Sequence, residues 1–137
     1  MITLIATAFR ANNTLAQNWQ ANKRLLELAD KHKAFNIEEV IGSFKEEGQE
    51  HASQEVSYKL TVETLSQARN LAGAIMSTFN QDAVLLLTDK LGVYRVQFDG
   101  AYLQHLNLGH WVQITEEEAQ ASECYTLDSL GQYWAAK

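Results

Sequence analysis

The 137-residue chain contains no proline and a single cysteine, Cys124. Average usage would place about seven prolines in a chain of this length, so their absence argues against proline-rich linkers, polyproline recognition segments and a low-complexity tail. One thiol excludes an internal disulfide framework and a metal site built from several cysteines. We therefore expect a single compact domain over residues 1–137, in a reducing compartment such as the cytoplasm.

Positive charge and long apolar runs are also scarce. Eleven Lys and Arg residues stand against seventeen Asp and Glu residues, which gives a formal net charge of −6. Binding to nucleic acid needs clustered basic side chains, so it is not expected here. No apolar run approaches the roughly twenty residues that span a bilayer, and the N-terminus lacks the basic start of a signal peptide. The composition predicts a soluble protein with no nucleic-acid or membrane partner, and a neutral or cationic small ligand suits its charge.

The order of apolar patterns predicts alternating strands and helices. Strands are expected at Ile2–Phe9, Phe35–Phe44, Val56–Val62, Asp82–Leu87 and Gly92–Phe98. Thr14 with Gln17, and Thr64 with Gln67, have the spacing of a capping box, so a helix is expected to follow each pair. Shorter elements are expected at 101–106 and 111–115, in a helical turn at 116–121 and in a closing segment from Tyr125 to Trp134.

The series of strand, capping box, helix and strand occurs twice, with the second capping box fifty residues after the first. A twofold βαβ plan whose right-handed crossovers bring the strands into one sheet is the ferredoxin-like arrangement. We therefore predict an α+β fold: a ferredoxin-like βαββαβ sandwich with an antiparallel sheet, extra C-terminal strands and a short helix. Helices on one face leave the other face bare, so the C-terminal elements or a second subunit are expected to cover it.

Acidic side chains are concentrated in one stretch of the chain. Six glutamates and one lysine lie between Glu38 and Glu55, which gives a local charge of −5. The section from Lys45 to Gln54 is polar and lacks periodicity, so a hairpin loop is expected there. This loop is either a solvated hairpin, or it carries a carboxylate that folds over the sheet to meet a cationic substrate or to act as a base.

The other candidate residues form no recognised metal or nucleophile pattern. Four histidines are scattered, and the spacing of His105 and His110 fits no zinc motif. Cys124 follows the acidic Glu123 and has no neighbouring cation in the sequence, so it is expected to be a buried structural thiol. Arg10, at the end of the first strand, is expected either to clamp a substrate carboxylate or to pair with the acidic loop.

Several short segments resemble the phage-encoded enzymes that degrade S-adenosylmethionine (SAM), described as SAM hydrolases and SAM lyases. The segments follow the family's order and cover nearly the whole chain. They are Ala8-Phe9-Arg10-x-Asn12, Gly42-Ser43, Gln67-Ala68-x-Asn70-x-Ala72, Gln81-Asp82-x-Val84-Leu85 and Cys124-Tyr-Thr-Leu-Asp128-x-x-Gly131-x-x-Trp134.

The resemblance implies a ferredoxin-like core and a homotrimer with substrate sites between adjacent subunits, and it implies no metal or cofactor. It also implies that SAM is split to 5′-methylthioadenosine and homoserine lactone, because the substrate's own carboxylate attacks the γ-carbon. Loss of SAM would counteract SAM-dependent restriction and methylation in the host cytoplasm. Since sulfonium is already a good leaving group, such an enzyme mainly has to fold its substrate into a reactive geometry.

The resemblance further assigns site residues. The family's essential glutamate aligns with Glu50, where it would orient the substrate ammonium or polarise the ribose, and Glu47 and Glu55 are alternatives for this role. Phe44 stands where some members have a tyrosine, so a hydroxyl contact is absent there. The residues assigned to substrate binding are Phe9, Arg10, Gly42, Ser43, Phe44, Glu47 and Glu55. Two other functions stay open: a SAM hydrolase that gives homoserine directly, and a non-catalytic trimeric regulator that binds an adenine nucleotide.

Overall fold

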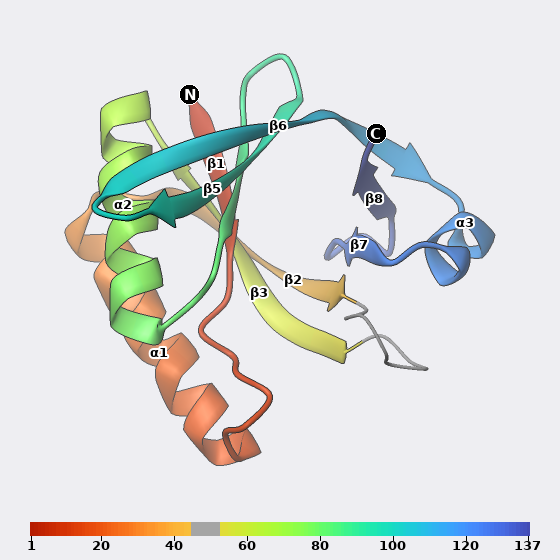
Figure 1. The fold of residues 1–137 in the computed structure, drawn as a ribbon. Coiled ribbons are helices and arrows are strands. Elements are labelled where there is room, and N and C mark those ends of the chain that lie inside the picture. Colours follow the sequence, from red (N-terminus) through yellow and green to blue (C-terminus); the bar gives the residue numbers. More distant parts are fainter. Residues whose placement is uncertain (45–52) are drawn as a thin grey trace.

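The computed structural model describes residues 1–44 and 53–137. Within these ranges the chain forms eight strands and three helices (Figure 1). In chain order they are β1 (Ile2–Ala6), α1 (Leu15–Lys31), β2 (Phe35–Phe44), β3 (Ser53–Val62), α2 (Leu65–Phe79), β4 (Val84–Leu87), β5 (Gly92–Asp99), β6 (Tyr102–Ile114), α3 (Glu116–Ala121), β7 (Cys124–Leu127) and β8 (Tyr133–Ala136).

The strands form one antiparallel sheet that closes into a barrel. Their order is β1-β3-β2-β7-β8-β6-β5-β4, and β4 pairs again with β1. Half of this order, β4-β1-β3-β2, is joined through α1 and α2 and constitutes the predicted βαββαβ unit. The predicted α+β class with an antiparallel sheet is confirmed.

The predicted sandwich takes the form of a closed barrel, because the strands that follow the βαββαβ unit pair with both of its edge strands, β2 and β4. β7 pairs with β2 from Ile41↔Leu127 to Phe44↔Cys124, and β8 pairs with both β7 and β6. Each strand of the described chain then has two neighbours, so the sheet keeps no open edge. The sheet face that the helices leave bare becomes the interior of this barrel, where the C-terminal elements cover it, as one of the two expectations had it.

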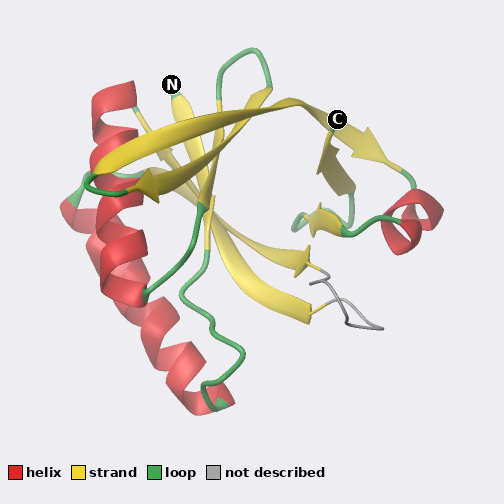
Figure 2. Cartoon of the chain, viewed as in Figure 1, coloured by secondary structure: helices red, strands yellow, loops and turns green. Residues whose placement is uncertain are grey.

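Helices α1 and α2 lie side by side against the outside of the barrel (Figure 2). Both begin with the predicted capping box: Thr14 accepts from the Gln17 amide, Thr64 accepts from the Gln67 amide, and each glutamine side chain returns to the threonine backbone. The buried side chains of both helices pack on one face of β1, β3 and β4. This cluster includes Leu25 and Ala29 of α1, Leu71 and Ile75 of α2, and Leu4, Leu60 and Leu86 of the sheet.

The opposite face of the strands fills the barrel, because successive residues of a strand point to opposite sides. The buried apolar side chains of this interior are Ile5, Val40, Leu87, Val93 and Trp111. Trp111 stacks on Trp134 of β8, with ring centroids 6.4 Å apart. A smaller cluster beneath α3 includes Ile114 and Ala119. The C-terminal strands therefore contribute both to the closure of the sheet and to its core.

Several of the predicted element boundaries are wrong. β3 begins at Ser53 rather than at Val56, and the closing segment predicted from Tyr125 to Trp134 forms two strands, β7 and β8. β1 ends at Ala6 rather than at Phe9, because the residues that follow form hydrogen bonds with side chains of α1. β6 is one strand, whereas two elements were predicted at 101–106 and 111–115. The register of this long strand against β5 shifts between Val93 and Tyr94, opposite Gly109 with its φ of 98°, as at a β-bulge within one strand.

Candidate active site

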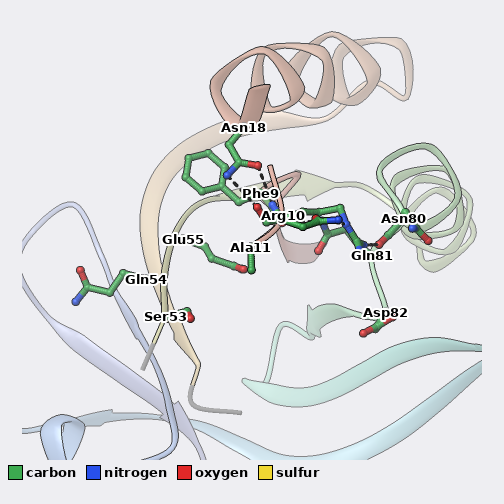
Figure 3. Close-up of a pocket in the computed structure, with 11 residues that line it drawn as sticks. Phe9, Arg10, Ala11, Asn18, Ser53, Gln54, Glu55, Asn80, Gln81 and Asp82 are labelled. Carbon is green, nitrogen blue, oxygen red and sulfur yellow. Dashed lines mark hydrogen bonds between the residues drawn. The ribbon is translucent and has the colours of Figure 1, made fainter. Parts of the chain in front are cut away.

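A pocket of about 650 Å³ lies where the β1–α1 loop, the α2–β4 loop and the start of β3 meet (Figure 3). This volume is within the range of small-molecule sites, roughly 300–1,000 Å³. The residues that line the pocket are Phe9, Arg10, Ala11, Asn12 and Asn18 from the first loop and α1, Ser53, Gln54 and Glu55 from β3, and Asn80, Gln81 and Asp82 from the second loop.

The β1–α1 loop is held in place by side-chain hydrogen bonds. Its backbone has left the sheet, and buried amide groups need partners. The side chain of Asn22 accepts from the Ala8 amide at 2.9 Å and donates to the Val56 carbonyl at 3.0 Å. The Phe9 amide donates to Thr7 Oγ1 at 3.0 Å. The loop is thus fixed to both α1 and β3 before any ligand binds.

Arg10 is held at its backbone and at its guanidinium. Asn18 Oδ1 accepts from the Arg10 amide at 2.8 Å, and Asn18 Nδ2 donates to the Arg10 carbonyl at 3.1 Å. The guanidinium Nη1 donates to the carbonyl of Asn80, and Nε donates to Asn12 Oδ1 at 3.4 Å. Arg10 therefore bridges the two loops that line the pocket.

The pocket carries charges of both signs. Arg10 and Glu55 are half-buried, and Asp82 is exposed. The Arg10 guanidinium donates to two neutral oxygens, the Asn80 carbonyl and Asn12 Oδ1. The lining therefore places a positive charge at Arg10, which suits an anionic ligand group, and negative charge at Glu55 and Asp82.

The sequence assignment brings only some of its site residues to this pocket. Phe9, Arg10 and Glu55 line it. Gly42 and Ser43 do not line it, but they lie on β2 directly beside it, because Gly42 pairs with Glu55 and Ser43 pairs with the pocket residue Gln54.

Two further features of β2 concern the assigned residues. Ser43 is only 2% exposed, and its Oγ has no hydrogen-bond partner among the described residues. Phe44, the last residue of β2, pairs through its backbone with Ser53 of the pocket.

Glu47 and Glu50 belong to the stretch between Phe44 and Ser53 and lie outside the described residues, so their assignment stays a prediction. An ion pair between Arg10 and that stretch stays a prediction for the same reason.

The sequence reading missed the amide side chains and Asp82 as pocket residues. Gln81 donates to the Phe9 carbonyl at 3.0 Å, and Asn80 ends α2 in a left-handed conformation with φ of 53°. A signal for them was present, because Gln81 and Asp82 belong to one of the segments that carry the family resemblance. Sequence alone did not show that this segment would face the segment around Arg10.

Cys124 and His105 are placed away from the pocket lining. Cys124 is exposed, so the prediction of a buried thiol is wrong. Nearby protein atoms nevertheless desolvate the Cys124 thiol and raise its pKa, and the charge of Arg95, which lowers the pKa, has the smaller effect. The thiol is therefore protonated at neutral pH. Burial and the charge of Arg69 lower the pKa of His105, so its imidazole is neutral at pH 7.

Comparison with known proteins agrees with the family resemblance. The sequence model of the S-adenosylmethionine lyase family matches residues 4–137. The chain belongs to the S-adenosylmethionine lyase family. This membership implies that the protein is an enzyme with SAM lyase activity. A search of curated proteins gives no match.

The family segments of this SAM lyase have different structural roles. Those at 8–12 and 81–85 meet at the pocket. The segment that ends the chain instead builds a turn: Asp128 accepts from the Leu130 amide at 2.9 Å, the Gln132 amide at 2.8 Å and Trp134 Nε1 at 2.9 Å. These contacts join β7 to β8 and thereby support the closure of the barrel.

The described part of the SAM lyase chain lacks two features. In residues 1–44 and 53–137, no three His, Cys, Asp or Glu side chains gather closely enough to hold a metal ion. No helix of the described chain is both long and apolar enough to cross a membrane.

Proposed function

We propose that residues 1–137 act as one SAM lyase domain that converts SAM to 5′-methylthioadenosine and L-homoserine lactone. The substrate's carboxylate oxygen attacks its own γ-carbon, and a carbon–oxygen bond forms as the carbon–sulfur bond breaks. The electron pair of the broken bond neutralises the sulfonium, so the reaction consumes no water and needs no proton transfer. An enzyme for this step has to bring the carboxylate and the γ-carbon together in line with the leaving sulfur.

The observation that carries this proposal is the charge distribution of the pocket. SAM has a carboxylate at one end of its methionyl group, next to an ammonium, and a sulfonium further along. Arg10 offers a guanidinium that suits the carboxylate, while Glu55 and Asp82 offer negative charge to the cationic groups. Groups of both signs in one preformed pocket allow the methionyl chain to be held by its charges while it folds.

Glu50 is proposed as the essential glutamate, with the role of orienting the substrate ammonium or polarising the ribose. The residues on either side of 45–52 support this role: Phe44 and Ser53 pair with each other, and Ser53 lines the pocket. Gly42, Ser43, Phe44 and Glu47 are proposed to complete the binding surface beside Phe9, Arg10 and Glu55.

We further propose that the enzyme works as a homotrimer with sites between adjacent subunits. Exposed apolar side chains on β5 and β6 support association, since patches of this kind mark interaction surfaces. They are Phe98, Tyr102, Leu106, Leu108 and Val112. In the cell, depletion of SAM would counteract restriction and methylation that depend on it.

Product analysis tests the proposed reaction. Purified protein is incubated with SAM in water labelled with heavy oxygen, and the products are separated at early times. We expect methylthioadenosine and unlabelled homoserine lactone; homoserine that forms later by opening of the lactone carries the label in its carboxyl group. Label in the homoserine hydroxyl would show that water attacks the γ-carbon and that the enzyme is a hydrolase. Saturable SAM binding without methylthioadenosine would overturn the enzymatic function and indicate a regulator.

A further inference from the structure

We propose that Asn18 is a positioning residue for SAM cleavage, because it fixes the backbone from which the Arg10 guanidinium extends into the pocket. This role rests on the proposed function, in which Arg10 binds the substrate carboxylate. Since that carboxylate is also the nucleophile, the direction of the guanidinium sets the angle at which the carboxylate meets the γ-carbon.

Asn18 occupies both backbone hydrogen-bonding groups of Arg10 with one side chain. Its Oδ1 accepts from the Arg10 amide at 2.8 Å, and its Nδ2 donates to the Arg10 carbonyl at 3.1 Å. Asn13 Nδ2 donates to the same Oδ1 at 3.3 Å. Asn18 is 8% exposed as a residue, and the three bonds are partly buried, so water has limited access to them. The Arg10 carbonyl also accepts from the Asn13 amide at 3.1 Å. A rotation of the Arg10 backbone would break both bonds to Asn18 and leave the buried Asn18 side chain without these partners.

The contact with the Arg10 backbone explains why residue 18 is an asparagine, whereas helix propensity does not. Asparagine is a weak helix former, because its side chain competes for nearby backbone groups. Asn18 lies in the first turn of α1, where its side chain reaches back to the loop that precedes the helix. A buried amide costs stability unless its groups are satisfied, and here Arg10 satisfies them.

Asn22, one helical turn further along α1, provides a matched comparison. It is also buried, with no exposed surface, and it also bonds the loop through the Ala8 amide. Its second bond, however, goes to the carbonyl of Val56 on β3 and anchors the loop to the barrel. The contacts of Asn18 stay within the loop around Arg10. Asn22 therefore serves the fold, and Asn18 serves the geometry of the pocket.

A double-mutant cycle between Asn18→Ala and Arg10→Gln separates positioning from stability. We expect Asn18→Ala alone to lower kcat/KM by about 10- to 100-fold, mainly through kcat, because a poorly aligned carboxylate reacts slowly even when it is bound. In the Arg10→Gln background the same change is expected to lower kcat/KM by less than about twofold, since the group that Asn18 positions is already gone.

Asn22→Ala is the matched control. We expect its effect on kcat/KM to be the same in the wild-type and Arg10→Gln backgrounds, and its drop in Tm to be at least as large as that of Asn18→Ala. Asn18→Asp keeps the acceptor and removes the donor, so we expect an intermediate kcat, and it replaces Asn18→Ala in the cycle if the latter does not fold. Equal losses in both backgrounds, with an active wild-type enzyme, would overturn the role of Asn18 alone. A wild-type protein that forms no methylthioadenosine would overturn the proposed function and this role with it.

Discussion

Gln81 donates a hydrogen bond from Nε2 to the carbonyl of Phe9 at 3.0 Å, although the two residues are 72 positions apart in the chain. Arg10, which follows Phe9 in the β1–α1 loop, donates in turn from its guanidinium to the carbonyl of Asn80, which precedes Gln81. Together these bonds join the β1–α1 and α2–β4 loops into one wall of the pocket. Loops that are usually mobile are thereby held in a fixed arrangement by the scaffold.

Arg10→Lys is expected to raise KM for SAM about tenfold. Lysine retains the charge but loses the planar fork that binds a carboxylate through two parallel bonds, and it also loses the simultaneous contact with Asn12 and Asn80. Steady-state kinetics with purified protein measure the change. Arg24→Lys is the control, because Arg24 lies over the Phe79 ring of the helix layer and does not line the pocket. A KM equal to that of the wild type would remove Arg10 from the substrate site.

Glu50→Gln is expected to lower kcat by about 100-fold or more, because the neutral amide no longer holds a cationic substrate group in the reactive geometry. Glu47→Gln and Glu55→Gln, measured in parallel, identify which of the three carboxylates has this role. We expect smaller losses for both, mostly in KM. If Glu55→Gln gives the largest loss in kcat while Glu50→Gln retains near wild-type turnover, the essential glutamate is the one at the start of β3.

Gly109→Ala is expected to destabilise the fold by about 2–4 kcal/mol. Gly109 has φ of 98°, and a Cβ there would lie 2.6 Å from the carbonyl carbon of Lys137. The same Lys137 backbone exchanges hydrogen bonds of 2.9 and 2.8 Å with His110, so it cannot move without opening the end of β8. Urea unfolding measures the loss.

Gly100→Ala provides the control for the effect of positive φ alone. Gly100 has φ of 63°, and nothing lies within 4 Å of a Cβ built on it. We expect a loss of about 1 kcal/mol from the left-handed conformation. Equal losses for Gly109→Ala and Gly100→Ala would contradict the steric explanation.

Asp128→Asn is expected to lower stability at pH 7 by about 1 kcal/mol. Partial burial favours a higher pKa of Asp128, but hydrogen bonds from Gln132, Trp134 and Leu130 together outweigh it and hold the pKa below its ordinary value. The charged form is therefore favoured in the folded state. Asparagine keeps an acceptor for the backbone amides but directs an amino group at Trp134 Nε1, which is itself a donor.

The pH dependence of the same variant provides a second readout. Because the pKa of Asp128 is lower in the folded state, its stabilisation is complete above the unfolded pKa of about 4 and is lost as the pH falls through the folded value. The difference in unfolding free energy between wild type and Asp128→Asn should thus shrink below about pH 4. A difference that stays constant from pH 7 to pH 3 would show that the charge of Asp128 does not contribute.

The sequence by itself determined the local structure of this protein. Thr14 and Gln17, and Thr64 and Gln67, predicted where both long helices begin, because a capping box needs only side chains three residues apart. Short runs of apolar residues, and the alternation in Val56–Val62, predicted the strands of the βαββαβ unit for the same short-range reason. The resemblance of several segments to SAM lyases then identified the family that the whole-chain match establishes.

Only the tertiary structure decided that the sheet closes and which residues share the pocket. Closure depends on the pairing of β7 with one side of β2. The pairing of β3 with the other side of β2 sets Gly42 beside Glu55. The sequence carries no signal for the contact between Asn18 and Arg10, and the partner of Gln81 lies at the other end of the βαββαβ unit. Such contacts join residues far apart in the chain, and no periodicity or spacing specifies them. They arise because the barrel brings the ends of β1, β3 and α2 together, where these side-chain amides bond the backbone of the β1–α1 loop.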